Sequence, residues 1–207
     1  MNGESKRIAI FGPESTGKTR LAEKLAAHFG APLVAEYARE RWDQQGALGL
    51  EDMLPIAQEQ WRREDAATAL LQATGHATQG GPLGRAPEHP CLLSKEAPRS
   101  GGIVICDTDA LTTMLWSDLL YGTCPDELRR GAEKRCKNYA LYLLLDIDVP
   151  FAPDPQRCFP DPADREKGRR IWRGALERRQ LPFVDIRGDW AAREAAAIAA
   201  VERLLAS

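Results

Sequence analysis

A glycine-rich run near the start of the chain has the spacing of a loop that binds phosphate. Residues 12–19 read GPESTGKT and fit the pattern G-x-x-x-x-G-K-[ST]. The glycines let the backbone curl so that successive N–H groups point at phosphate oxygens, while the lysine reaches the β- and γ-phosphates and the last hydroxyl reaches Mg²⁺. A chance match is the alternative, and the strand and helix patterns on either side argue against it. We expect ATP and Mg²⁺ to bind at Gly12, Pro13, Glu14, Ser15, Thr16, Gly17, Lys18 and Thr19.

Carboxylates stand at the ends of two further apolar runs. Asp107 follows the apolar run 103–106, and we expect it to hold Mg²⁺ together with Thr19. Asp109 is either a substrate contact or the cap of the next helix, and the sequence favours neither role. Glu36 is placed to accept the proton of an acceptor hydroxyl, with a surface ion pair to Arg39 as the alternative. Ligands of open α/β sheets bind beyond the carboxyl ends of the strands, so Glu36, Asp107 and Asp109 are expected to converge there.

Arginines are available to neutralise a phosphoryl group in transfer. Arg39 lies one helical turn after Glu36, and Arg157 lies in the proline-rich segment 149–162, which we expect to close as a lid. Arg165, on the basic helix that follows, is expected to contact the nucleotide. A solvated helix face is the alternative, and it is favoured for Arg173, Arg178 and Arg179. The predicted catalytic residues are Lys18, Glu36, Asp109 and Arg157.

Short apolar runs alternate with helical patterns, which indicates βαβ units and a parallel sheet. Strands are predicted at 7–11, 32–35, 102–106, 140–147 and 182–186. A long helix is predicted over 52–73 with Asp52 as its N-cap, and Gly122 is expected to end a helix that carries Leu111 and Leu119. The segment 74–102 is rich in glycine and proline, so we expect a flexible insertion without helix or strand. The fold class is therefore α/β with helices on both faces of the sheet.

Length and charge narrow the class of protein further. A chain of 207 residues fits a single domain, and a formal net charge of −2 argues against a general nucleic-acid binder. The apolar runs are far too short to span a membrane, and the N-terminus has no apolar signal region, so we expect a cytoplasmic protein. The 5 cysteines show no paired spacing, so neither disulfides nor a structural metal are expected. Cys106 and most tryptophans are expected in the core.

Taken together, these motifs resemble the P-loop nicotinamide riboside kinase domain of bacterial NadR proteins. The resemblance rests on GPESTGKT, EYARE at 36–40, a Gln-bearing helix at 56–60, DTDALTTMLW at 107–116, YGTCP at 121–125 and PFVDIRG at 182–188. It implies strand order 2-3-1-4-5, a lid after the fourth strand, and ATP- and Mg²⁺-dependent phosphorylation of the 5′-hydroxyl of nicotinamide riboside. The implied substrate contacts are Glu36, Tyr37, Arg39, Trp42, Gln60, Asp109, Thr113, Trp116 and Tyr121. The lid reads Asp154-Pro-Gln-Arg157 where the family usually has Asp-Gly-x-Arg, and the insertion is not typical of the family.

Two other functions remain compatible with the sequence. One is a kinase for another nucleoside, because no motif reads the base directly. The other is a nucleotide-binding regulator, although the guanine-reading Asn-Lys-x-Asp motif is absent. The expected partners are ATP and a small nucleoside, with no nucleic acid or membrane, and the sequence leaves homo-oligomerisation open. No adenylyltransferase pattern is present, so a separate enzyme would be needed to complete NAD.

Overall fold

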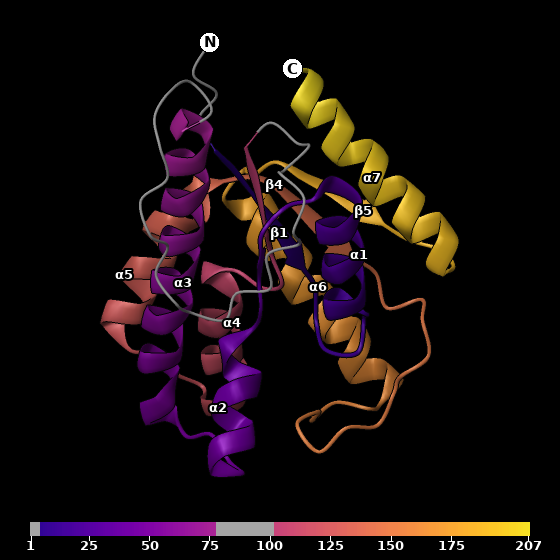
Figure 1. Cartoon of the computed structure of the whole chain (residues 1–207). Helices are drawn as coiled ribbons and strands as arrows, with labels where there is room; N and C mark the ends of the chain where they lie inside the picture. Colours follow the sequence, from indigo (N-terminus) through magenta and orange to yellow (C-terminus); the bar gives the residue numbers. More distant parts are fainter. Residues whose placement is uncertain (1–4, 78–101) are drawn as a thin grey trace.

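A parallel sheet of five strands forms the centre of the molecule (Figure 1). The computed structural model describes residues 5–77 and 102–207. The strands are β1 (Lys6–Phe11), β2 (Leu33–Val34), β3 (Ile103–Cys106), β4 (Tyr139–Leu145) and β5 (Phe183–Ile186). Their order across the sheet is β2-β3-β1-β4-β5, and all four neighbouring pairs are parallel. The predicted fold class and strand order are confirmed.

Helices cover both faces of this sheet (Figure 1). One face packs against α1 (Lys18–Phe29) and α7 (Trp190–Ala206). The opposite face packs against α3 (Leu50–Ala77), α4 (Ala110–Tyr121), α5 (Asp126–Arg135) and α6 (Pro162–Arg178). The short helix α2 (Tyr37–Gln45) lies against α3, and a 3₁₀ turn, η1 (Cys136–Asn138), precedes β4. Within the described ranges, no helix combines the length and the apolar character needed to cross a bilayer.

The alternation of side chains along β1 explains why both faces are buried. Ile8 and Ile10 pack with α1 and α7, whereas Ala9 and Phe11 point to the other face. Successive residues of a strand point to opposite faces, so a strand that is covered on both sides is apolar throughout. Each fully buried aliphatic side chain of this kind stabilises the fold by about 1.5–3 kcal/mol. On the second face, the fully buried Trp172 lies beside Phe11 with ring centroids 6.5 Å apart.

Several local predictions need correction. The long helix α3 begins at Leu50 and runs to Ala77, so residues 74–77 are helical rather than part of an insertion without helix. Asp52 is not an N-cap: it lies inside the first turn, where its carboxylate accepts the N–H of Gly49 and pairs with Arg41. The helix α5 was not predicted. Residues 78–101, which make up most of the expected insertion, lie outside the described residues.

Three smaller expectations concern Cys106, Gly122 and the tryptophans. Cys106 is fully buried, and Gly122 ends α4 with φ 68°, a left-handed conformation that favours glycine. Trp172 is the tryptophan that is fully buried among the described residues. Trp190 stays 39% exposed at the start of α7. Trp61 and Trp116 are partly buried and pack against the same core as Trp172, so the expectation that most tryptophans belong to the core holds for these three residues.

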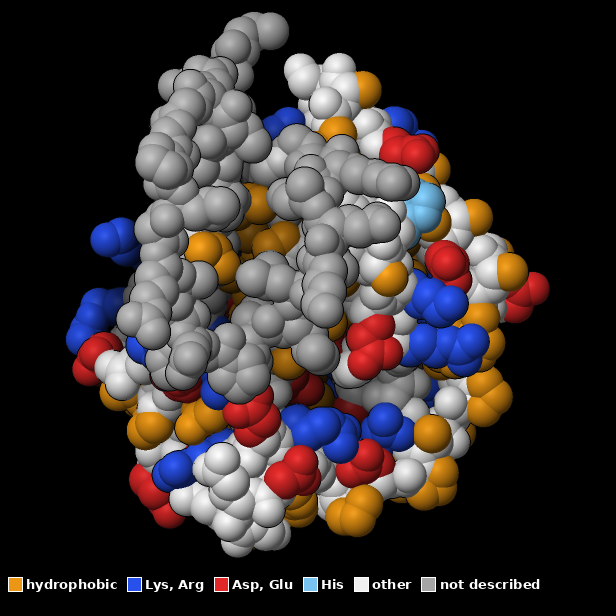
Figure 2. Space-filling model, in the orientation of Figure 1, with side chains coloured by type: hydrophobic (Ala, Val, Ile, Leu, Met, Phe, Trp, Pro, Cys, Tyr) orange, Lys and Arg blue, Asp and Glu red, His pale blue; other side chains and the backbone are white. Residues whose placement is uncertain are grey.

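The parallel arrangement places the loops that follow β1, β2, β3 and β4 at one edge of the sheet. In Figure 1 the phosphate loop, α2 and the lid all lie at this lower edge. Figure 2 shows side chains of both charge signs gathered in the same lower central region. The candidate site is therefore assembled where the carboxyl ends of the strands meet.

Candidate active site

The phosphate loop connects β1 to α1 and is shaped by its glycines. Gly12 and Gly17 have φ values of 149° and 84°. A Cβ at Gly17 would lie 2.5 Å from the ring of Trp190, so a larger residue is excluded for steric reasons as well. Ser15 is also left-handed, at φ 55°, and this alternation turns successive N–H groups toward one side of the loop. The loop therefore offers an anion site lined by backbone N–H groups.

The start of α1 adds to that anion site. The helix begins at Lys18, and its N-cap Gly17 has no side chain to occupy the first-turn N–H groups. These groups and the helix dipole favour a bound anion. The Lys18 ammonium lies beside the loop and donates to the Pro13 carbonyl oxygen at 2.9 Å. The binding of phosphate by this backbone and by Lys18 stays a prediction of the motif, and the geometry of the loop is compatible with it.

Arg193 of α7 binds the phosphate loop through the carbonyl oxygen of Thr16. Sequence analysis did not identify this arginine. Its guanidinium is buried and donates to the carbonyl oxygens of Thr16 (2.8 Å), Gly188 (2.9 Å) and Asp146 (2.8 Å). It also pairs with Asp148. A planar fork with several donors suits this set of carbonyl groups. One side chain of α7 thus ties the phosphate loop to the end of β4 and to the loop after β5.

Asp107 and Thr19 meet at the point where a magnesium ion would be needed. The Thr19 hydroxyl and the charge of Lys18 lie close enough to the Asp107 carboxylate to act on its pKa, both in the lowering direction. Burial raises the pKa of Asp107 to about 7, and the negative charge of Glu36 acts in the same direction. Among the described residues, the buried Oδ1 atom of Asp107 has no hydrogen-bond partner. An unpartnered carboxylate oxygen beside a hydroxyl fits a hard divalent cation, so these residues suit Mg²⁺.

Glu36 and Asp109 both precede a helix, but the structure uses them differently. Asp109 is buried, and its carboxylate accepts the N–H groups of Leu111 and Thr112, each at 2.9 Å. It is therefore the N-cap of α4, and it does not line the large cleft described below. Glu36 is the N-cap residue of α2, yet its side chain makes no cap hydrogen bond. Of the two carboxylates, Glu36 is the one that faces the cleft.

The segment 149–162, which is predicted to be a lid and is called the lid below, is attached to the phosphate loop by Glu14 and Ser15 of that loop. The Glu14 carboxylate accepts the N–H groups of Cys158 (3.1 Å) and Phe159 (2.6 Å). The Ser15 hydroxyl accepts the N–H of Ala152 at 2.8 Å and lies 3.4 Å from a guanidinium nitrogen of Arg157. Arg157 thus lies next to Ser15 of the phosphate loop, and its role as a lid arginine stays a prediction.

Two further contacts join the lid to the helices around it. Arg39 of α2 pairs with Asp154 of the lid at 3.2 Å, and the Phe159 ring stacks on Trp116 of α4 at 6.1 Å between centroids. Arg165 donates to the Val149 carbonyl oxygen at 2.9 Å, at the base of the lid. Its observed role is therefore to anchor the lid, and it does not line the cleft predicted to hold the nucleotide.

A cleft of ≈ 680 Å³ opens between the phosphate loop, α2, α4 and the lid. Most of the predicted site residues line it: Glu14, Ser15, Thr16, Gly17, Lys18, Thr19, Glu36, Arg39, Trp42, Thr113, Trp116, Tyr121 and Arg157. Its apolar wall includes residues that sequence analysis did not single out: Leu48, Met53, Ile56 and Leu120. The helical spacing of Met53 and Ile56 identifies them as one face of α3, but that spacing is equally typical of core residues. The cleft combines a charged end with an apolar end.

Two predicted substrate contacts have structural partners instead. The Gln60 side chain is buried, and its oxygen accepts the N–H of Tyr37 at 3.0 Å. The Tyr37 ring lies under the guanidinium of Arg63, 4.5 Å from it. Tyr121 lines the cleft, and its hydroxyl donates to the Leu48 carbonyl oxygen at 2.8 Å. Gln60 and Tyr37 therefore lie behind the cleft wall rather than in it.

Comparison with known proteins gives one matching family model and several solved structures of similar fold. The model of a family described as AAA domain matches residues 7–79 and 89–193. A NadR protein in complex with NR superposes with a TM-score of 0.69 at 22% identity, over 100% of this chain and 53% of that chain. A NadR protein in complex with NAD and AMP-PNP gives a TM-score of 0.65 at 21% identity, over 100% and 51% of the two chains.

A thymidylate kinase from Ehrlichia chaffeensis has the same fold, with a TM-score of 0.58 at 13% identity, over 96% of this chain and 100% of that chain. The chain spans about half the length of the two NadR chains that it matches. No curated protein sequence matches it. The fold likeness to NadR is in line with the resemblance of the sequence motifs.

Proposed function

The chain belongs to the AAA domain family, and on that premise we propose that it is a kinase that transfers the γ-phosphoryl group of ATP to a hydroxyl of a nucleoside. The observation that carries the proposal is that one cleft is lined by both Lys18 and Glu36. Lys18 belongs to the donor side of the reaction, where the phosphates bind. Glu36 makes no cap hydrogen bond and is available to an acceptor alcohol.

Each charged residue has a defined task in this proposal. Lys18 and the N–H groups of residues 12–19 bind the β- and γ-phosphates. Thr19 and Asp107 are the residues that would hold Mg²⁺, which when bound neutralises charge on the phosphates. Glu36 accepts the proton of the attacking hydroxyl as the new P–O bond forms and ADP leaves. Arg157, placed over the loop by the lid, stabilises the negative charge of the transferred group.

For the acceptor, we propose nicotinamide riboside, phosphorylated on its 5′-hydroxyl to nicotinamide mononucleotide. The proposal is supported by the sequence motifs and by the fold likeness to a NadR protein in complex with NR. The rings of Trp42 and Trp116 and the side chains of Met53 and Ile56 give the cleft an apolar, partly aromatic wall. A wall of this kind suits a planar base.

The test is a panel of acceptors offered to the purified protein with ATP and Mg²⁺ while ADP release is followed. Nicotinamide riboside is expected to give a clearly higher kcat/KM than uridine, cytidine or thymidine. Lys18→Ala is the loss control, because it removes the phosphate-binding ammonium and leaves the apolar wall of the cleft intact. Preference for a common nucleoside would reject nicotinamide riboside but retain a nucleoside kinase. ATP binding without acceptor-dependent ADP release would reject the kinase and favour a nucleotide-binding regulator.

A further inference from the structure

The lid contains a tight turn that ends at Arg157. In residues 154–157 the carbonyl oxygen of Asp154 accepts the N–H of Arg157 at 2.9 Å, which closes a β-turn. One carboxylate oxygen of Asp154 also accepts the N–H of Gln156, at 3.0 Å. Aspartate and proline are favoured at the first two positions of such a turn, and Asp154 and Pro155 occupy them here. Asp154 therefore fixes the backbone from which the Arg157 side chain extends.

The second carboxylate oxygen of Asp154 binds α2, which forms another wall of the cleft. This oxygen pairs with the guanidinium of Arg39 at 3.2 Å, and the two residues are 115 positions apart in the chain. The N–H of Gln156 and the charge of Arg39 lower the pKa of Asp154, so its carboxylate is ionised at neutral pH. One side chain thus holds the turn that carries Arg157 and also attaches that turn to α2.

This attachment links the two residues proposed to act on the acceptor and on the phosphoryl group. Glu36 directly precedes α2, Arg157 ends the turn, and both line the cleft. The guanidinium of Arg157 has contacts of its own, with the Ser15 hydroxyl at 3.4 Å and with the carbonyl oxygen of Ala152. Those contacts hold the tip of the side chain near the phosphate loop, whereas Asp154 sets the Arg157 backbone relative to α2. A group that stabilises a transition state depends on such supporting contacts for its position.

We propose that Asp154 is a positioning residue: its two carboxylate oxygens join the turn that carries Arg157 to Arg39 of α2, and this places the Arg157 guanidinium for the transferred phosphoryl group. The inference rests on the proposed kinase function. Asp154 does not itself line the cleft, so it acts on turnover through Arg157. The side chains of Arg39 and Asp154 are 44% and 21% exposed, and an ion pair in this setting contributes little to global stability. Removal of Asp154 should therefore slow phosphoryl transfer in a protein that still folds and binds ATP.

A double-mutant cycle with Asp154→Ala tests the inference, with the rate of phosphoryl transfer followed in single turnovers. In the wild-type background, this rate should fall at least about tenfold, while the Kd for ATP stays within about twofold. In an Arg157→Ala background, the same substitution should change the rate by less than about twofold, because the side chain to be positioned is absent.

Two further variants test whether the effect is specific to this carboxylate. Asp154→Asn keeps an oxygen atom for the N–H of Gln156 but loses the charge that faces Arg39, so its rate should lie between those of wild type and Asp154→Ala. The matched control is Asp43→Asn on α2, whose carboxylate accepts the Gln156 side chain at 3.2 Å in an exposed pair. This control should stay within about twofold of wild type. Equal losses for Asp43→Asn and Asp154→Ala would overturn the inference.

The outcomes separate this inference from the function on which it rests. A wild-type protein that phosphorylates no nucleoside would reject the kinase function and, with it, the role of Asp154. Turnover with an equal loss in both backgrounds would show that Asp154 supports the fold only, and would overturn the inference alone. If Asp154→Ala fails to fold, Asp154→Asn takes its place in the cycle. Its loss should then be at least about threefold in the wild-type background and absent in the Arg157→Ala background, and any other result overturns the inference.

Discussion

The two hydrogen bonds from the lid to Glu14 should have a measurable effect on how often the lid opens. The Glu14 carboxylate accepts the N–H groups of Cys158 and Phe159, and its removal in Glu14→Ala leaves both donors to solvent. A hydrogen bond to a charged group contributes about 1.5–3 kcal/mol when it is well shielded. Glu14 is only half-buried, so about 1 kcal/mol for each bond is the better figure. The loss of both bonds, about 2 kcal/mol, corresponds to about 30-fold more frequent opening at these two positions.

Hydrogen–deuterium exchange of the ligand-free protein measures this opening directly. The amides of Cys158 and Phe159 should exchange about 30-fold faster in Glu14→Ala than in wild type. The amide of Ala152 serves as an internal control, because it is held by Ser15 and should change little. Arg157 lies in the same segment, so kcat should fall as well, by at most the same factor.

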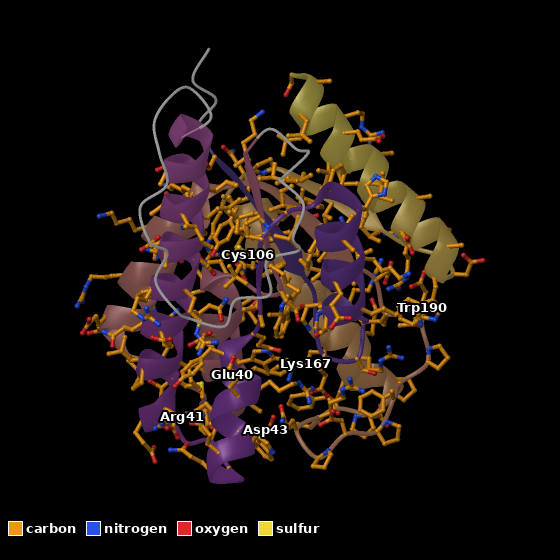
Figure 3. The ribbon with its side chains drawn as sticks, in the orientation of Figure 1. Glu40, Arg41, Asp43, Cys106, Lys167 and Trp190 are labelled. Carbon is orange, nitrogen blue, oxygen red and sulfur yellow. The ribbon has the colours of Figure 1, made fainter. Side chains whose placement is uncertain are left out.

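A matched variant separates the Glu14 contacts from other contacts of the lid. Gln156 of the lid donates to Asp43 at 3.2 Å in an exposed pair, and Asp43 lies on α2 at the lower edge of the molecule (Figure 3). Gln156→Ala should change the exchange of Cys158 and Phe159 by less than about twofold, because exposed polar contacts contribute little. Equal exchange rates in wild type and Glu14→Ala would refute the reasoning. That result would mean that other contacts hold the lid, such as Phe159 on Trp116.

Three further predictions follow from the site. Asp107→Asn should cripple turnover and weaken its dependence on Mg²⁺ concentration, measured by ADP release, because a neutral amide anchors a hydrated cation poorly. Arg157→Ala should lower kcat by roughly 10³-fold with ATP affinity within several-fold, whereas the exposed Arg178→Ala should be near neutral; small, equal effects would contradict the lid role. Burial raises the pKa of Glu64 from 4.5 to about 7, so the folded state holds this proton more tightly and wild-type stability should decrease as the pH rises between these values. In urea unfolding, the free energy of unfolding of Glu64→Gln should increase relative to that of wild type by on the order of 3 kcal/mol as the pH rises across that window. If the difference between the two free energies does not depend on pH, the raised pKa of Glu64 is excluded.

The features that could be predicted from the sequence are those that depend on local spacing. The phosphate loop is a contiguous motif between a strand and a helix. The five strands are short apolar runs, because a parallel sheet that is covered on both faces needs apolar side chains on both. The helix α5 was missed because only Leu128 and Ala132 are buried in it. Two positions four residues apart are too few to show a helical period. Its remaining residues are mostly charged, a composition equally typical of a loop.

The contacts that complete the site are of another kind, because they join residues far apart in the chain. Glu14 and Cys158 are separated by 144 positions, and Arg193 and Thr16 by 177. No local pattern marks such pairs. For Arg193 a weak signal exists, since an arginine in the alanine-rich start of α7 falls on the face that packs against the sheet. A buried guanidinium needs several acceptors, and the carbonyl groups of the loops at the sheet edge supply them.

The contrast between Glu36 and Asp109 shows why residue type and position do not identify a base in this fold. Both are carboxylates that follow a strand of the same sheet and precede a helix, so the sequence treats them alike. Asp109 satisfies the N–H groups of its own helix, and a carboxylate held by two such hydrogen bonds has little freedom to reach a substrate. Glu36 makes no hydrogen bond of that kind at the start of α2, and it lines the cleft. In an α/β protein of this type, the candidate base is therefore sought by asking which of these carboxylates leaves its own helix uncapped and lines the cleft, a question that needs the structure and not only the residue type and position.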